Sequence, residues 1–225
     1  MATLEERKEL AAKKLEQYGQ THVLKYYDTL TAEEKDRLLT QIEQTDLSVT
    51  KYVHHREELP GRGEITPLKA LEISEIQKRE KEYHAIGLEQ IRAGKVAAVL
   101  LAGGMGTRLG SDNPKCMYDI GLTHPVYIMQ RLVENMMDVV HEAGRFFPFF
   151  IMTSDKNHDA TVSFMKEHAY FGYDPEMVFF FQQDMAPATD YDGKIYMENR
   201  FRMASSPNGN GGWFSSMNKA GLLDK

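Results

Sequence analysis

The spacing of hydrophobic positions divides the chain into two parts. In residues 1–93 apolar positions recur at near-helical intervals, which predicts amphipathic helices. Gly19 and Gly94 follow such segments and are typical of helix ends. Three pairs have the S/T-x-x-E/Q spacing of a capping box, in which two side chains satisfy free amides at a helix start: Thr3 with Glu6, Thr31 with Glu34, and Ser74 with Gln77. We therefore expect a helical N-terminal region over 1–93.

From residue 94 the pattern changes to short apolar runs separated by helical segments. VAAVLLAGG, PFFIMTS and MVFFFQQ predict strands, and helices are expected at 126–141 and 159–168. Such alternation predicts a doubly wound, mainly parallel α/β sheet over 94–225. The last segment, GGWFSSMNKAGLLDK, predicts a helix with no strand after it. We therefore expect a sheet that is incomplete at its C-terminal side, as in a truncated domain.

Composition narrows the class of protein. The 225 residues are 42% hydrophobic and 27% charged, as in a globular protein. A net charge of -6 argues against a broad nucleic-acid surface. No apolar run approaches the ~20 residues of a membrane span, and MATLEERKELAAKK is too charged for a signal peptide. The single cysteine, Cys116, fits a reducing compartment, so we expect a cytoplasmic protein.

The strongest chemical signal is LAGGMGTRLGSDNPKCMYDIGL, which directly follows the first predicted strand. Its glycines let backbone amides approach phosphate oxygens, and Arg108 and Lys115 add positive charge. The spacing fits neither a Walker A loop nor a G-x-G-x-x-G dinucleotide fingerprint. Taken alone, the segment leaves a plain glycine-rich turn open as an alternative.

Several motifs in the same order resemble one known family. LAGGMGTRLG and PKCMYDIGL, then IMTS, FFQQ, DGKI and PNGNGG, are similar to the signatures of UDP-N-acetylhexosamine pyrophosphorylases and UDP-sugar uridylyltransferases. The resemblance implies a Rossmann-like nucleotidyltransferase fold. It also implies that UTP and a sugar 1-phosphate, with N-acetylglucosamine 1-phosphate the favoured candidate, form a UDP-sugar and pyrophosphate.

The resemblance also implies roles for particular residues. Arg108 and Lys115 would meet the triphosphate as the catalytic cations, and Gln183 would read the uracil. Asn210 would contact the sugar. The nucleotide would further lie against Leu101, Ala102, Gly103, Gly104 and Gly209. From the residues alone, Gln183 could instead be a polar strand end, and Gly209 with Asn210 a tight turn.

The sequence departs from the family pattern at two positions, and the expected metal ligand is not among its 225 residues. Cys116 stands where the family usually has glycine, and Asn208 where it has aspartate. Mg²⁺ is the implied cofactor, but its aspartate ligand is expected beyond residue 225, so we assign no metal ligand. Asp112 and Asp119 are not assigned because loop aspartates are usually solvated or capping. The 225-residue chain alone is expected to show little synthesis.

Three functions stay open at this point: a uridylyltransferase, a nucleotide-binding or regulatory remnant without activity, and an interaction module built on the N-terminal helices. The glycine-rich loop favours the first two. The sequence does not determine which sugar 1-phosphate is used, nor the oligomeric state.

Overall fold

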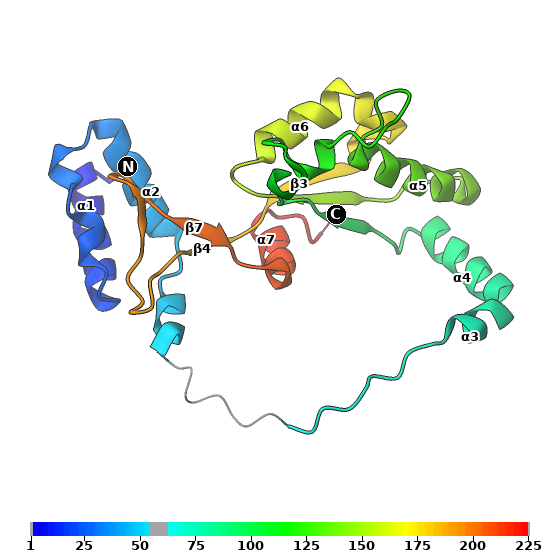
Figure 1. The fold of residues 1–225 in the computed structure, drawn as a ribbon, viewed down its shortest axis with the longest axis horizontal. Coiled ribbons are helices and arrows are strands. Elements are labelled where there is room, and N and C mark those ends of the chain that lie inside the picture. The colour runs from blue at the N-terminus through cyan, green and yellow to red at the C-terminus, as the bar shows by residue number, and fades with distance from the viewer. Residues whose placement is uncertain (1, 55–62, 225) are drawn as a thin grey trace. The chain divides into compact units, whose positions relative to one another are not determined.

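The structure is a computed structural model that describes residues 2–54 and 63–224. Backbone contacts divide it into two compact units (Figure 1). Unit 1 comprises Met1–Ile65 and Met185–Asn208, and unit 2 comprises Thr66–Asp184 and Gly209–Lys225. The division therefore differs from the boundary predicted at residues 93 and 94. Residues 66–93 group with unit 2, where Glu80–Arg92 contacts Ile128–Ala143, and residues 185–208 group with the N-terminal helices.

The helices and strands carry the labels of Figure 1. The α-helices are α1 (Leu4–Gln17), α2 (Ala32–Gln44), α3 (Ile73–Lys78), α4 (Glu80–Arg92), α5 (Ile128–Ala143), α6 (His158–Glu167) and α7 (Trp213–Lys219). The strands are β1 (Ala98–Leu101), β2 (Phe149–Thr153), β3 (Val178–Gln182), β4 (Met185–Pro187), β5 (Met197–Asn199), β6 (Arg202–Met203) and β7 (Ser205–Pro207). Within the described residues, no helix is both long enough and apolar enough to cross a bilayer.

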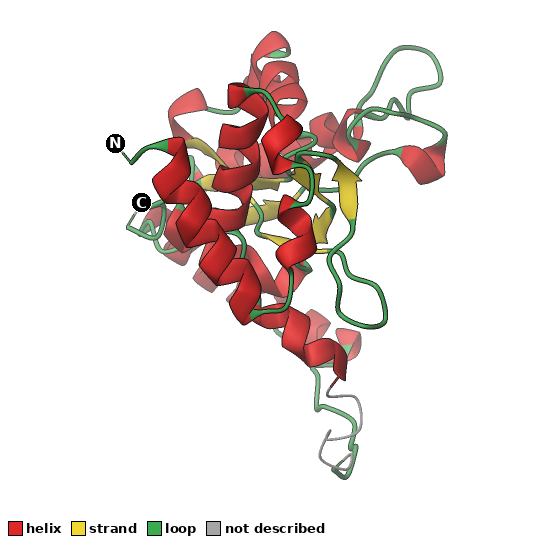
Figure 2. Cartoon of the chain, turned by 90° about the vertical axis from the view of Figure 1, so that its left-hand side faces the viewer, coloured by secondary structure: helices red, strands yellow, loops and turns green. Residues whose placement is uncertain are grey.

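Unit 1 has a helical core, and Figure 2 shows its helices in red. Helices α1 and α2 begin at predicted capping boxes: Thr3 and Thr31 each accept a hydrogen bond from the amide three residues later, at 3.3 Å. The third predicted box is wrong, because α3 begins at Ile73 and Ser74 already lies inside it. The buried core of unit 1 consists of Ala11, Leu15, Val23, Tyr27, Leu30, Leu38, Leu39, Ile42, Leu47, Ile195 and Met203.

Residues 185–208 form two short antiparallel pairs, β4 with β7 and β5 with β6. Two glutamine side chains fasten this segment to the helices of unit 1. Gln20 donates to the Gly193 carbonyl at 2.7 Å and accepts from the Ile195 amide at 3.0 Å. Gln41 likewise donates to the Met203 carbonyl at 2.9 Å and accepts from its amide at 2.8 Å. Each carboxamide thus pairs with the backbone as a neighbouring strand would.

Unit 2 is an α/β structure, which confirms the predicted fold class. Its described strands form a parallel sheet in the order β1-β2-β3, with Leu101 opposite Met152 and Met152 opposite Phe181. Helices α5 and α6 lie on one face of the sheet and α7 on the other (Figure 1). The sheet is small, with three strands in the described part of unit 2.

Alternation along the strands explains why both faces are covered. On β2, Phe149 and Ile151 belong to the core beneath α5 and α6, whereas Phe150 and Met152 pack with Met217 of α7. Side chains of a strand point alternately to its two faces, so a continuous apolar run supplies two cores. This is the signature on which the parallel sheet was predicted.

Helix α4 lies against α5 at the margin of unit 2 and has no fully buried residue. Arg92 donates to the carbonyl oxygens of Ala143 and Glu142, at 3.1 and 3.0 Å, so polar contacts attach this helix. Gly94 ends it with φ of 73°, in the left-handed region that glycine adopts without strain.

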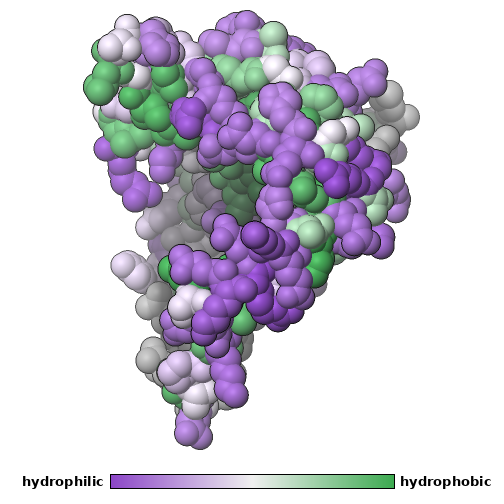
Figure 3. All heavy atoms as spheres, turned by 90° about the vertical axis from the view of Figure 1, so that its right-hand side faces the viewer, coloured by the Kyte–Doolittle hydropathy of each residue, from purple (hydrophilic) through white to green (hydrophobic). Residues whose placement is uncertain are grey.

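Figure 3 shows hydrophilic side chains over most of the face seen there, between separate apolar areas.

Candidate functional site

The carboxyl ends of β1, β2 and β3 meet at one edge of the sheet, where α/β proteins bind their ligands. The glycine-rich loop follows β1 at this edge. Ser154 to Asn157 follow β2, and Gln183 follows β3. Backbone hydrogen bonds continue on both sides of β2 just beyond β1 and β3. The Ala102 amide donates to the Met152 carbonyl at 2.7 Å, and the Gln183 amide donates to the Thr153 carbonyl at 2.8 Å. The predicted loop and the predicted base reader are thereby brought to the same edge.

The glycine-rich loop folds back on itself through backbone hydrogen bonds. Gly106 donates to the Asn113 carbonyl at 2.8 Å, and Lys115 donates to the Gly104 carbonyl at 3.1 Å. A Cβ atom at position 106 would lie 2.9 Å from the Asn113 carbonyl oxygen, so this close approach requires glycine. At position 104 a Cβ atom would meet nothing within 4 Å, so the Gly104 backbone faces open space.

Gln183 is the side chain that the fold places against this loop. A Cβ atom at position 103 would lie 2.6 Å from Gln183 Nε2, so Gly103 and the carboxamide are in direct contact. Gln183 is 8% exposed, and its Nε2 has no hydrogen-bond partner among the described residues. A buried amide left unpaired costs roughly 1–3 kcal/mol, so an acceptor atom placed beside Gln183 Nε2 would lower the free energy of the site.

Lys115 and Cys116 occupy a short 3₁₀ turn, Lys115–Met117, at the return of the loop. The Lys115 side chain is exposed, whereas Cys116 is buried beneath the loop in the core that contains Met129 and Val133. Burial raises the pKa of the Cys116 thiol, which keeps it neutral. The cysteine that replaces the expected glycine therefore fills interior space and does not crowd the exposed side of the loop.

Arg108 lies in the tip of the loop, in the turn Thr107–Leu109, and is exposed. Gly209 and Asn210 lie at the entrance to α7, with Gly209 at φ of 79°. Both residues are exposed. Leu101, at the end of β1, is 39% exposed, and Ala102 is half-buried beside the core.

Helix α7 is nevertheless fastened to the end of β3. The Asp184 amide donates to Ser216 Oγ at 2.9 Å, and Lys219 Nζ donates to both carboxylate oxygens of Asp184, at 2.8 and 2.9 Å. Sequence reasoning did not select these residues. Asp184 directly follows FFQQ, and its position after a predicted strand was the available signal. Its partners Ser216 and Lys219 lie more than thirty positions later in the chain.

Asp119, an acidic residue of the loop, has structural partners. Asp119 Oδ1 accepts from the Gly121 and Val126 amides, at 2.8 and 2.9 Å. The bond from Val126, followed by that from Gly121, lowers the pKa of this carboxyl. Asp119 therefore caps the turn, as expected of a loop aspartate. The described residues contain no cluster of three or more His, Cys, Asp or Glu side chains that could hold a metal ion.

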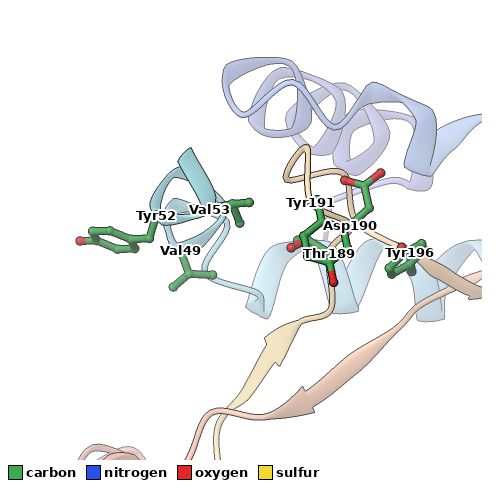
Figure 4. A pocket seen from close by; sticks show the side chains of 7 residues that line it. All are labelled: Val49, Tyr52, Val53, Thr189, Asp190, Tyr191 and Tyr196. Carbon is green, nitrogen blue, oxygen red and sulfur yellow. The ribbon is translucent and has the colours of Figure 1, made fainter. Parts of the chain in front are cut away.

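A separate pocket lies in unit 1. Figure 4 shows it between the segment that carries Val49, Tyr52 and Val53 and the turn that carries the other labelled residues. Its volume is about 650 Å³, and Thr189, Asp190, Tyr191 and Tyr196 complete its lining. None of the predicted site residues belongs to this lining, so the pocket is distinct from the glycine-rich loop.

The parallel sheet, the loop after its first strand and the carboxamide after its third strand define a doubly wound α/β protein with its candidate site at the carboxyl edge of the sheet. The chain belongs to the UTP--glucose-1-phosphate uridylyltransferase family, whose model matches residues 37–225.

Individual relatives agree with that assignment. UDP-N-acetylglucosamine diphosphorylase 2 of Arabidopsis thaliana is 37% identical, over 94% of this chain and 46% of that protein. UDP-N-acetylglucosamine pyrophosphorylase of Saccharomyces cerevisiae is 33% identical, over 88% of this chain and 46% of that protein. The chain thus spans about half the length of the curated relatives it matches.

A solved structure is similar as well. The crystal structure of uridine diphosphate N-acetylglucosamine pyrophosphorylase from Trypanosoma brucei, in complex with an inhibitor, superposes with a TM-score of 0.74 at 26% identity. The match covers 96% of this chain and 46% of that one.

Proposed function

We propose that this chain binds UTP at the glycine-rich loop and serves a uridylyltransferase that forms UDP-N-acetylglucosamine and pyrophosphate from UTP and N-acetylglucosamine 1-phosphate. The observation that carries the proposal is the buried, unpaired carboxamide of Gln183 in contact with Gly103. The names of the similar Arabidopsis and yeast proteins supply the sugar. A cytoplasmic location, suggested by the single cysteine, is part of the proposal.

Uracil suits the chemistry of Gln183. A carboxamide offers both a donor and an acceptor, and uracil presents an N3–H donor beside carbonyl acceptors. The contact with Gly103 holds the carboxamide at the loop, so the base would lie beside the backbone of Gly103 and Gly104. A carboxamide can also pair with adenine through N6–H and N7, so the preference for uridine rests on the family to which the chain belongs.

The reaction needs stabilisation of the negative charge on the phosphates more than it needs a general base. A phosphate oxygen of the sugar 1-phosphate is already ionised; it forms a bond to the α-phosphorus of UTP, and the bond from that phosphorus to the β-phosphate oxygen breaks as pyrophosphate leaves. Exposed Lys115 and Arg108 would offset the negative charge, with Arg108 toward the leaving pyrophosphate. Asn210, near α7, would approach the sugar.

The proposal includes Mg²⁺ as the companion of the triphosphate, where it would neutralise phosphate charge. The described residues do not fit a metal site made by the protein alone, because they contain no group of three or more His, Cys, Asp or Glu side chains that could hold a metal ion. The roles given above are therefore confined to the chain's own groups. A second candidate function is nucleotide binding without turnover, which the glycine-rich loop and the unpaired Gln183 carboxamide support equally well.

Calorimetry with UTP and ATP, combined with pyrophosphate release on the same sample, tests both candidates. We expect UTP to bind more tightly than ATP, and Gln183→Ala to weaken UTP binding about tenfold, since an unpaired buried group is worth roughly 1–3 kcal/mol. Gln182→Ala is the matched control: Gln182 is the exposed neighbour at the end of β3, and its replacement is expected to leave UTP binding unchanged.

Equal affinity for UTP and ATP, or equal effects of the two glutamine variants, would contradict the uridine site. UTP binding without pyrophosphate release would favour the second candidate. Sustained release at about 1 per second or faster would establish turnover by this chain.

A further inference from the structure

Asn157 is completely buried at the carboxyl edge of the sheet, and both its side-chain nitrogen and its side-chain oxygen form hydrogen bonds to the backbone. Its Nδ2 donates to the carbonyl oxygens of Ala102 and Gly104, at 2.9 and 3.4 Å. Its Oδ1 accepts from the Ser154 amide at 2.7 Å. The carboxamide thus connects the end of β2 to the start of the glycine-rich loop.

These contacts control where the loop amides point. All described peptide bonds are trans, and in a planar trans peptide the carbonyl and the following N–H point in opposite directions. When Asn157 holds the Ala102 and Gly104 carbonyls on its own side, the N–H groups of Gly103 and Met105 are directed away from it. The Gly104 carbonyl also accepts from the Lys115 amide at 3.1 Å, so both limbs of the loop share this anchor.

We propose that Asn157 is a positioning residue for nucleotide binding: it sets the orientation of the loop peptides that meet the nucleotide and does not contact the nucleotide itself. The inference rests on the proposed function. It distinguishes Asn157 from Gln183, because the side-chain nitrogen of Gln183 has no partner in the protein, whereas the side-chain nitrogen and oxygen of Asn157 both bond to the backbone.

Two substitutions separate the donor from the acceptor role. Asn157→Ala removes both. Asn157→Asp keeps an acceptor for Ser154 but places a carboxylate against two carbonyl oxygens. We expect both variants to weaken UTP binding between about 10- and 100-fold at pH 8, as misplacement of a binding group does. Gln20→Ala is the matched control, since Gln20 is a buried carboxamide that bridges two backbone groups in unit 1; its UTP affinity should stay within about twofold.

The pH profile supplies a readout that a general loss of packing would not give. Burial and the facing carbonyls raise the pKa of the carboxyl introduced by Asn157→Asp, and its protonated form can donate to Ala102 as the amide did. UTP affinity of Asn157→Asp relative to the unmodified chain should therefore recover as the pH falls from 8 to 6, whereas that of Asn157→Ala should not. Measurements are made well below the unfolding temperature of each variant.

Amide hydrogen exchange without nucleotide provides a second readout: Gly106 and Lys115 should exchange faster in Asn157→Ala than in Gln20→Ala. UTP affinity unchanged in both Asn157 variants, or an equal loss in both at every pH, would overturn the inference while leaving the nucleotide site in place. Absence of UTP binding by the unmodified chain would overturn the proposed function, and the inference with it.

Discussion

Lys115 has two groups at the candidate site, and their roles can be tested separately. Its backbone amide donates to the Gly104 carbonyl and closes the glycine-rich loop, whereas its side chain is exposed. Substitution of the side chain keeps the backbone hydrogen bond. A change in ligand binding can therefore be assigned to the ammonium group and not to the shape of the loop.

We predict that Lys115→Met weakens UTP binding about ten- to a hundredfold and uridine binding hardly at all, because a charge-assisted contact to phosphate is worth roughly 1.5–3 kcal/mol. Calorimetry with both ligands measures the difference. Lys166→Met, which removes an exposed ammonium near the end of α6, is the control. An equal loss for UTP and uridine would show that Lys115 supports the fold instead of the phosphates.

The sequence motifs pointed to some residues of the candidate site and not to others. The motif around the glycine-rich loop and the FFQQ segment selected Gly103 and Gln183, and the structure brings the two into contact. Asn157 escaped notice because nothing local distinguishes it from a helix-capping asparagine. Its partners at Ala102 and Gly104 lie more than fifty positions earlier in the chain and become visible only in three dimensions.

At the scale of elements, the segment after α6 holds an unusual backbone. Ala169, Tyr170 and Phe171 adopt φ values of 48°, 53° and 52°, in the left-handed region that residues other than glycine rarely occupy. Phe171 packs with Phe164 and His168, whose ring centroids lie 5.8 and 5.1 Å from its own. Aromatic packing against α6 thus compensates for backbone strain in the turn.

We predict that Ala169→Gly stabilises the protein by about 0.5–1 kcal/mol, since relief of left-handed strain outweighs the added freedom of the unfolded chain. Urea unfolding measures the change. Ala160→Gly, at an exposed position inside α6, should have the opposite sign and cost about 0.5–1 kcal/mol. Destabilisation by both substitutions would show that the turn is not strained.

Elements were predictable where one segment carried its own signal. β2 and β3 followed from continuous apolar runs, and α1 and α2 from capping boxes that the structure confirms. The pairs β4 with β7 and β5 with β6 did not, because strands of two or three residues have too few positions for a periodic pattern. This part of the chain is held by distant partners instead: Gln41 of α2 pairs with Met203 of β6, and Gln20 pairs with Gly193 and Ile195 between β4 and β5.

At the scale of the whole molecule, the two units have separate hydrophobic cores. The core of unit 1 contains Leu15 and Leu38, and the cores of unit 2 contain Ile151 and Met152. Trp213 of α7 is the single tryptophan of the sequence, and it packs against the core that contains Met152. Its fluorescence therefore reports on unit 2.

We predict that UTP at about 100 times its dissociation constant stabilises the transition followed by Trp213 fluorescence by roughly 2.7 kcal/mol, because a ligand stabilises the cooperative unit that binds it. Amide exchange at Ile195 and Met203, whose N–H groups donate to Gln20 and Gln41 in unit 1, should change little. Equal protection of both units by UTP would refute a site confined to unit 2.

The sequence by itself determined the class of fold, the family and the identity of the loop, because apolar periodicity and closely spaced motifs are properties of short segments. Tertiary structure decided what depends on segments far apart in the chain. It assigned residues 185–208 to the N-terminal helices, directed Cys116 into the core and set Gln183 against Gly103. Burial and hydrogen bonding between distant groups fix these arrangements, and no local pattern encodes which distant partner a buried polar side chain will find.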